Sequence, residues 1–421
     1  MPADPTPSDR LLPLWAGRTA ALLGILLVAL NLRTAVASLS PILGMIERDI
    51  PLNPVVIGVV GAAPPLMFAL AGLVSPPLSR RLGLEGLLLA AIGAMVVGQL
   101  ARALAPDPVT LVVSTALALL GAGMGNVLLP PLVKRYFPDR MTQVTTGYAV
   151  LIAFSTALPA LAAVPVATAF GWRASLCVWV ALALTAIVPW IVASRARARV
   201  LRLARESDDD NVVESEPALE GRLFRSPVAW AIMIVFSVSS FTIYAGLAWL
   251  PSLLVETAHV TPGQAGSLLA LYAIAGFPCS LVVPSIAARL KNVGILIYVA
   301  VGFLLVGYGG LLLFPTVATP LWVVVAGLGP LLFPLALYLI NERTRTHAGS
   351  VALSGFVQGV GYLIAAASPL LFGVLHQVTG GWTLSLAMLI VVSLAAIPAA
   401  IILRRRRYLE DDLARHSRAS N

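Results

Sequence analysis

The stretch that decides the fold is TAALLGILLVALNLRTAVASLSPILGMI, residues 19–46, which lies between Arg18 and Glu47. About 20 consecutive apolar residues are enough to cross a bilayer as an α-helix. This stretch is longer, so it predicts a membrane-spanning helix rather than a cleaved signal peptide. Arg33 lies close to its centre. A charged side chain at that depth costs at least ~2.5–3.5 kcal/mol, and such residues usually face a bundle interior or a wet cavity.

The rest of the chain has the composition of a polytopic membrane protein. Its 421 residues are 59% hydrophobic and 11% charged, and the mean hydropathy is +0.92. These values predict an all-α membrane protein rather than a soluble domain. Twelve membrane-spanning helices are expected, near residues 19–46, 54–78, 84–104, 108–133, 143–170, 174–194, 227–255, 263–288, 293–314, 318–340, 348–375 and 383–403.

The distribution of basic residues predicts the orientation. Only Arg48, Arg102 and Arg173 fall on one side of the predicted spans, at loops or span ends, and Arg33 lies within a span. All other Lys and Arg residues fall on the opposite side, which the positive-inside rule makes cytoplasmic. We therefore expect a multi-pass protein of the plasma membrane (the inner membrane of a bacterial cell) with both termini in the cytoplasm. The net charge of +9 then reflects topology, and no nucleic-acid partner is expected.

The chain repeats itself about a mixed-charge stretch. Residues 73–82 (LVSPPLSRRL) resemble residues 281–290 (LVVPSIAARL), 208 positions later, and Trp172 resembles Trp382, 210 positions later. Two related six-helix bundles are therefore predicted, with a site between them near the midplane. The expected parts are an N-terminal tail (1–18), a first bundle (19–194), a cytoplasmic linker (195–226), a second bundle (227–403) and a basic tail (404–421).

Polar residues deep in the spans are the candidates for substrate binding. Arg33 heads them, because arginine does not lose its proton and no Asp or Glu lies deep in a span to neutralise it. On a continuous helix Arg33 points roughly 160° away from Asn31, so one of the two is expected to contact substrate and the other a neighbouring helix. The full candidate set is Arg33, Asn31, Thr34, Asn126, Tyr148, Tyr244, Gln358 and Tyr362. Helix packing and interhelical hydrogen bonding are the alternative roles for each.

Gating residues, cofactors and metals complete the predictions. Arg80 and Arg81, in a short cytoplasmic loop, and Arg289, the repeat counterpart of Arg81, are candidate gate residues, with a purely topogenic role as the alternative. Cys177 and Cys279 lie in apolar runs without metal or disulfide spacing. We expect no metal and no cofactor. The expected partners are a small-molecule substrate and membrane lipid, with a monomer as the functional unit.

Several motifs resemble those of one transporter family. They are Asn31-Leu32-Arg33, PPLSRRLG at 76–83, GNVLLPPLVK at 125–134, AWLP at 248–251, and Ser354 through Tyr362. Together they resemble the major facilitator superfamily and, within it, the cyanate and nitroimidazole permease family. The resemblance implies the major facilitator fold and small anionic or weakly polar substrates. The superfamily's loop pattern has an aspartate where this chain has Arg80.

The predicted function is therefore a secondary or facilitative transporter. It would move a small anionic or polar organic solute, cyanate-like or a carboxylate, by alternating access. The alternative is an exporter of neutral or nitroaromatic drug-like compounds. An enzyme is not expected, because no nucleophile–base or paired-carboxylate set lies at depth, and a sensor would need an output domain that the chain lacks.

Overall fold

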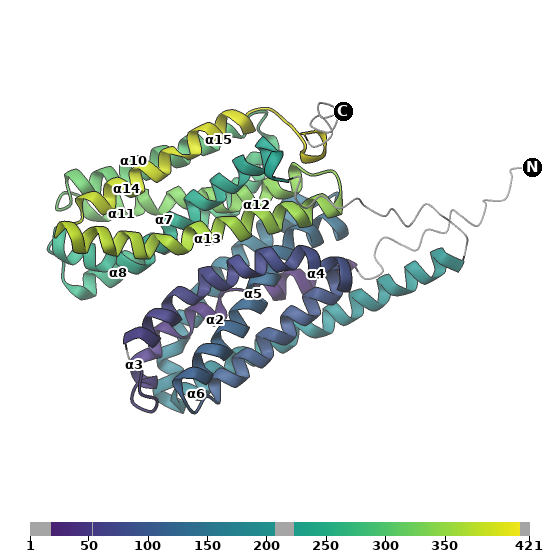
Figure 1. Ribbon diagram of the computed structural model, residues 1–421, viewed down its shortest axis with the longest axis horizontal. Helices are drawn as coiled ribbons and strands as arrows, with labels where there is room; N and C mark the ends of the chain where they lie inside the picture. The colour runs from purple at the N-terminus through teal and green to yellow at the C-terminus, as the bar shows by residue number, and fades with distance from the viewer. Residues whose placement is uncertain (1–17, 53, 207–222, 413–421) are drawn as a thin grey trace, which may run out of the picture.

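The computed structural model describes residues 18–52, 54–206 and 223–412, and the regular secondary structure in these ranges is helical. Figure 1 shows two lobes whose helices run roughly along the long axis of the molecule. The first lobe, drawn in purple to teal, holds α1 to α6, and the second, in green to yellow, holds α7 to α15. This is the arrangement expected of two bundles.

The first lobe contains two very long helices. Its elements are α1 (Arg18–Asn31), α2 (Thr34–Ala37), η2 (Ser40–Ile42), α3 (Leu43–Ile46), α4 (Pro54–Ala103), α5 (Pro108–Tyr136) and α6 (Met141–Glu206). Within α4, Gly83 has φ 72°, and within α6, Gly171 has φ 84°. Glycine adopts such positive φ values without steric cost. The helical path is interrupted at each of these glycines, so α4 and α6 each contain two of the predicted spans.

The second lobe is divided into shorter elements. They are η4 (Leu223–Arg225), α7 (Pro227–Thr257), α8 (Pro262–Ala275), α9 (Phe277–Arg289), α10 (Gly294–Leu313), α11 (Thr319–Leu328), η5 (Gly329–Leu331), α12 (Leu332–Glu342), α13 (His347–Thr379), α14 (Thr383–Leu394) and α15 (Ala396–Leu403). Across the described ranges, ten helical segments are long and apolar enough to cross a membrane. Counting α4 and α6 twice gives the twelve spans expected from the sequence.

The first predicted span is a helix that is interrupted near its middle. The helix stops after Asn31, turns through Leu32 and Arg33, and resumes as the single turn α2. At this point side chains form hydrogen bonds with backbone groups that the interrupted helix no longer pairs. The Arg33 amide donates to Ser155 Oγ at 3.2 Å, and Thr34 Oγ1 donates to the Asn31 carbonyl at 2.8 Å.

The segment predicted as a linker begins as helix, because α6 extends to Glu206. Residues 207–222 lie outside the described ranges.

The basic tail is described to residue 412, and it packs against the loop between α12 and α13. Leu409 donates its amide to the Arg343 carbonyl at 2.8 Å, and the Glu410 carboxylate accepts the amides of Arg345 and Thr346 at 3.0 and 3.1 Å.

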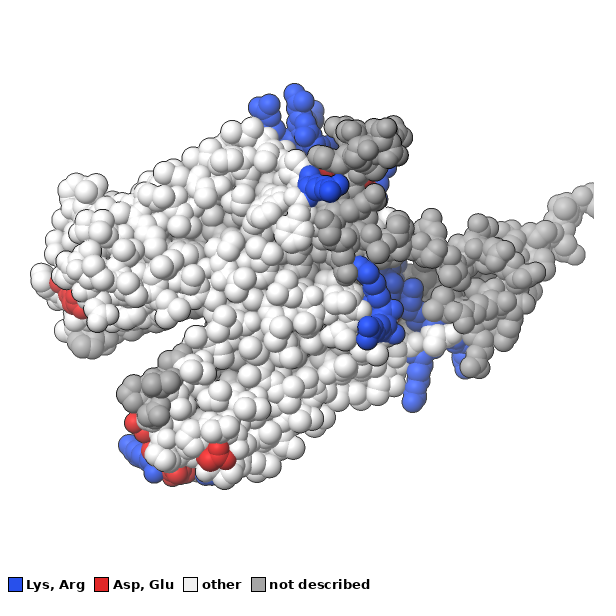
Figure 2. Space-filling view, in the orientation of Figure 1, with Lys and Arg blue, Asp and Glu red and all other residues white. Residues whose placement is uncertain are grey.

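The two ends of the molecule differ in charge. Figure 2 shows the described Lys and Arg side chains gathered mainly at one end, called here the basic end. At the opposite end, a notch visible in the same view separates the two lobes. Arg18, Lys134 and Arg404 belong to the basic end, and the turn at Gly171 belongs to the opposite end, since α6 crosses the lobe between Met141 and that turn. The lobes are therefore joined on one side and apart on the other.

The joint at the basic end is a close backbone approach reinforced by polar bonds. A Cβ atom on Gly72 of α4 would lie 2.3 Å from the Gly359 amide nitrogen of α13. Lys134 Nζ of α5 donates to the Asn341 carbonyl at 3.2 Å and to Thr344 Oγ1 at 2.8 Å, and it also bonds the Thr344 carbonyl. These contacts connect the first lobe to the second.

Candidate functional site

The Arg33 side chain bridges the two lobes. Its Nη1 donates to the Tyr244 hydroxyl of α7 at 3.3 Å, and its Nη2 donates to the Tyr362 hydroxyl of α13 at 3.1 Å. A guanidinium carries five N–H donors, and these two bonds are the side-chain hydrogen bonds it forms to described residues. No ion pair joins Arg33 to a carboxylate within the described ranges. The guanidinium thus keeps donors for further acceptors.

Aromatic rings surround this guanidinium. Its Cζ lies 5.0 Å from the Phe68 ring centroid and 5.9 Å from that of Phe333. The Tyr362 ring packs edge-on against Phe236 at 4.9 Å and against Phe68 at 5.2 Å. Cation–π contacts stabilise a charge by ~0.5–2 kcal/mol without neutralising it. The rings therefore hold the guanidinium in place without supplying a negative charge to balance it.

A chain of amide and hydroxyl groups extends from Tyr362 toward the first lobe. Asn126 Nδ2 of α5 donates to the Tyr362 hydroxyl at 3.2 Å and to Gln358 Oε1 at 2.5 Å. Gln358 Nε2 donates to Ser354 Oγ at 2.9 Å and to the Asn126 carbonyl at 3.3 Å. The Ser354 hydroxyl donates to the Val127 carbonyl at 2.7 Å. We call Arg33, Tyr244, Tyr362, Asn126 and Gln358 the Arg33 site.

Local sequence explains how these side chains meet. Ser354, Gln358 and Tyr362 are four residues apart on α13, so they share one helix face. A Cβ atom at Gly361 would come within 2.5 Å of the Phe236 ring, so glycine there allows that ring to pack beside Tyr362. In α5, a Cβ atom at Gly123 would come within 3.0 Å of the Phe68 side chain. The glycine-rich run near Asn126 thus brings α4 and α5 together by close packing.

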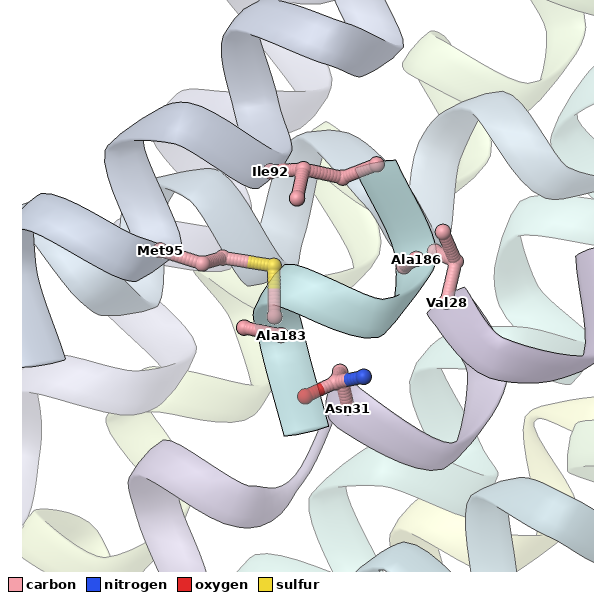
Figure 3. A pocket seen from close by; sticks show the side chains of 6 residues that line it. All are labelled: Val28, Asn31, Ile92, Met95, Ala183 and Ala186. Atoms are coloured by element: carbon pink, nitrogen blue, oxygen red, sulfur yellow. The ribbon is translucent and has the colours of Figure 1, made fainter. Parts of the chain in front are cut away.

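Asn31 and Thr34 do not join the Arg33 site. Asn31 Nδ2 donates to the Leu27 carbonyl at 2.8 Å and to the Leu182 carbonyl of α6 at 3.2 Å. Figure 3 shows Asn31 at a small pocket with Val28, Ile92, Met95, Ala183 and Ala186, all in the first lobe. The pocket leaves no room for a water molecule. Thr34 is fully buried, and its hydroxyl donates to the Asn31 carbonyl at the end of α1, across the break in the first span.

Tyr148 also lies apart from this site. Its side chain is 1% exposed and belongs to the hydrophobic core that the two lobes share. No hydrogen bond connects it to Arg33, Asn126 or Gln358. Of the eight candidates, the structure therefore brings together Arg33, Asn126, Tyr244, Gln358 and Tyr362. The interhelical hydrogen bonds that were the alternative for Asn126 and Gln358 are present.

The candidate gate arginines lie at the basic end. Arg80 and Arg81 are exposed just before the turn at Gly83. Arg289 is exposed and lines a groove of about 340 Å³ with residues 138–143, Ser285 and Ala288, drawn from both lobes. Sequence reasoning did not select Lys134, which makes the polar bonds between the lobes at this end. Lys134 was counted only among the basic residues of the expected cytoplasmic side.

Sequence reasoning also missed the burial of Arg102 and the position of two phenylalanines. Arg102 was assigned to a span end, but its side chain is fully buried. It lies at the end of α4 that faces away from the basic end, where it bonds the broken first span. Phe68 and Phe333 were not selected, because phenylalanine in an apolar span carries no signal that separates a site residue from a packing residue.

At the end opposite the basic end, each lobe contains a carboxylate that accepts hydrogen bonds from the same lobe. In the first lobe, Asp49 Oδ2 accepts from the Trp172 indole at 2.7 Å and from Arg173 at 3.1 Å. In the second, Glu256 Oε2 accepts from the Trp382 indole at 2.8 Å, and His376 lies 3.7 Å away. We call these the Asp49 clasp and the Glu256 clasp. The indole hydrogen bond and Arg173 hold the pKa of Asp49 below its usual range.

Comparison with known proteins supports the family assignment. Residues 22–366 match the family model described as Major Facilitator Superfamily. A 2-nitroimidazole transporter of Escherichia coli is 32% identical over 90% of this chain and 93% of its own length. The cyanate transport protein CynX of the same organism is 29% identical over 87% and 92%.

Solved structures give the same fold. The proton:xylose symporter XylE, bound to 6-bromo-6-deoxy-D-glucose, superposes with a TM-score of 0.71 over 95% of this chain and 98% of its own, at 13% identity. The predicted major facilitator fold is thus confirmed, and the transporter relatives agree with the expectation that the chain is not an enzyme. The chain is a solute transporter of the major facilitator superfamily, built as a multi-pass membrane protein.

Proposed function

We propose that the protein moves a small planar anion, such as a cyanate-like ion or an aromatic carboxylate, by alternating access around Arg33. The observation that supports this most strongly is the guanidinium between the lobes, which has no carboxylate partner in the described ranges and is held by two phenol hydroxyls. Burying such a cation is costly. An anion that displaces one or both hydroxyls would offset part of that cost, because it brings an opposite charge next to the guanidinium and can accept paired hydrogen bonds from it.

The remaining members of the Arg33 site fit the same role. Tyr244 and Tyr362 belong to the second lobe and Arg33 to the first, so a ligand bound to all three would contact both lobes. Asn126 and Gln358 supply amide donors and acceptors beside them. Flat rings at Phe68 and Phe333 suit a planar solute. Asn31, Thr34 and Tyr148 would act by packing the first lobe.

We further propose that the basic end faces the cytoplasm of a cell whose plasma membrane holds the protein. The positive-inside rule supports this orientation. The described state would then be open to the outside, with Lys134 and the Gly72–Gly359 approach closing the cytoplasmic side. In the opposite state these contacts would part, and Arg80, Arg81 and Arg289 at the same end would exchange partners.

A second candidate is export of neutral nitroaromatic compounds. The rings of Phe68, Phe236 and Phe333 around the Arg33 site support it, and nitro oxygens accept hydrogen bonds as carboxylate oxygens do. The two candidates differ in their dependence on charge. A neutral solute would lose only a hydrogen bond on removal of the guanidinium, whereas an anion would lose its counter-charge.

A thermal-shift titration tests the proposal. Sodium cyanate, sodium benzoate and 2-nitroimidazole are added to the purified native protein and to Arg33→Ala, with Arg48→Ala as a control, because Arg48 is exposed near α3. We expect at least one anion to raise the unfolding temperature of the native and control proteins and not that of Arg33→Ala. Equal shifts in all three proteins would contradict the counter-charge role.

A further inference from the structure

Arg102 is a second buried arginine, and the Arg33 site does not include it. Its side chain is fully buried at the end of α4, and no ion pair joins it to a carboxylate within the described ranges. Arginine keeps its proton under these conditions. A buried, permanent charge without an anionic partner needs a reason, and the atoms that Arg102 contacts supply one.

Both hydrogen bonds of Arg102 reach the segment that follows Arg33. Its Nη1 donates to the Ala35 carbonyl at 2.7 Å, and its Nη2 donates to Ser38 Oγ at 2.9 Å. In a continuing helix, the Ala35 carbonyl would accept the amide of Leu39. The helix α2 ends at Ala37 instead. Arg102 therefore supplies the donor that the backbone no longer provides, which satisfies the carbonyl at the end of this single turn.

The other end of α2 is fixed by a different helix. There the Arg33 amide donates to Ser155 Oγ of α6 at 3.2 Å. The turn that carries Arg33 is thus held between Ser155 on one side and Arg102 on the other. Four residues form too little helix to keep a conformation by their own hydrogen bonds. Side chains from α4 and α6 must set the direction of α2.

We propose that Arg102 is a positioning residue, which holds the break in the first span so that the Arg33 guanidinium stays between Tyr244 and Tyr362. The inference rests on the proposed role of Arg33 as counter-charge. It assigns Arg102 no contact with substrate. Without Arg102, α2 is free to rotate or to rejoin α1, and either movement carries Arg33 away from the two hydroxyls.

Transport kinetics test the functional part of this proposal. Uptake of cyanate, benzoate and 2-nitroimidazole into proteoliposomes is measured for the native protein and for Arg102→Met, Arg102→Lys and Ser38→Ala, with Arg48→Met as control. We expect Arg102→Met to raise KM about tenfold with a smaller change in kcat. Arg102→Lys, which can still reach the Ala35 carbonyl, should recover part of the loss, and Ser38→Ala should show a mild form of it.

A ligand-free measurement tests the positioning itself. Spin labels are placed at two exposed sites of the first lobe, Glu47→Cys after α3 and Val109→Cys at the start of α5, in a background of Cys177→Ala and Cys279→Ala. We expect a narrow distance distribution that Arg102→Met broadens and Arg48→Met leaves unchanged. If Arg102→Met does not fold, the distance distribution of Ser38→Ala is compared with that of the native protein instead. This variant keeps the charge of Arg102 and removes one of its two side-chain hydrogen bonds.

The outcomes separate the two proposals. If Arg33→Ala loses uptake while the Arg102 and Ser38 variants keep native KM and native label distances, the positioning role is overturned and the counter-charge role stands. If Arg33→Ala transports normally, or if the native protein takes up none of the three probes, the proposed function fails. In that case unchanged label distances in Arg102→Met or Ser38→Ala overturn the positioning role as well, and a broadened distribution supports its structural half alone.

Discussion

The two ends of this transporter are tied in different ways. At the basic end, bonds and close backbone contacts run between the lobes, as at Gly72 with Gly359 and at Lys134 with Thr344. At the opposite end, the Asp49 clasp and the Glu256 clasp each lie within one lobe. Alternating access requires the first kind of contact to break and the second kind to persist. Under the alternating access proposed above, contacts at the basic end would control the conformational state, and contacts at the opposite end would keep each lobe folded.

The largest effect is expected where the two backbones meet. In Gly72→Ala, the new Cβ would lie 2.3 Å from the Gly359 nitrogen, and neither backbone can yield without moving a whole helix. Overpacking of this kind costs roughly 3 kcal/mol. We expect the basic end to open, seen as longer distances between spin labels at Leu82→Cys and Lys291→Cys, and uptake to fall at least ~10-fold.

Gly93→Ala is the matched control for this change. Gly93 lies in the same element, α4, and a Cβ atom there would meet no other atom within 4 Å. Its label distances and uptake should stay native. If Gly72→Ala behaves like Gly93→Ala, the close approach of α4 and α13 does not hold the basic end shut.

Removing the polar bonds at the same end should have the next largest effect. Lys134→Met deletes the ammonium that bonds Thr344 and the Asn341 carbonyl. Hydrogen bonds to a charged group contribute ~1.5–3 kcal/mol, so the lower end of that range alone would shift the balance of states about tenfold. The Leu82–Lys291 label pair measures the shift. Arg407→Met, at an exposed position of the same end, should leave the distances native.

The clasps should respond in the opposite manner. Trp172→Phe and Trp382→Phe each remove one indole donor to a carboxylate. Each should lower the stability of the folded protein modestly, because the lost hydrogen bond is exchanged for one to water, and this would be seen as a lower unfolding temperature in detergent. The label distances at the basic end should stay native in both. Longer distances there would show that the clasps also control the state, and the comparison of the two ends would fail.

The smallest expected effect concerns acid stability at the Asp49 clasp. Because the pKa of Asp49 is lowered in the folded protein, the clasp contributes stability above the ordinary aspartate pKa of about 3.9. That contribution is lost as the pH falls through the lowered pKa. Asp49→Asn should therefore flatten the acid limb of the stability profile and lower the unfolding temperature slightly at pH 7. The exposed neighbour Glu47 provides the control, Glu47→Gln, which should keep the native profile.

Sequence alone predicted most of the fold, because apolar windows and the side preference of Lys and Arg follow directly from the bilayer as solvent. It did not predict the break at Arg33. The local pattern there is continuous, and the side chains that hold the break come from Ser155 and Arg102, far along the chain. For the same reason the burial of Arg102 at its span end was not predicted, since nothing near it in the sequence shows that Ala35 and Ser38 lie against it.

The candidate site was predicted in part. Mid-span polar residues are costly unless they are bonded or functional, and this argument selected Arg33, Asn126, Tyr244, Gln358 and Tyr362, which the structure brings together. It also selected Asn31, Thr34 and Tyr148, because the sequence shows the depth of a residue but not the face from which it meets its neighbours. Asn31 and Arg33 have different partners: Asn31 bonds α6 within the first lobe, and Arg33 reaches the second lobe.

Uptake by Arg33 variants tests the central claim most directly. Proteoliposomes of the native protein, Arg33→Ala and Arg33→Lys are supplied with cyanate, benzoate and 2-nitroimidazole, and initial rates are compared at equal protein. We predict that Arg33→Ala loses uptake of the anions by at least ~100-fold, as expected for a lost counter-charge, and that Arg33→Lys keeps part of it. Native rates in both variants would contradict the claim that Arg33 is the counter-charge of a transported anion.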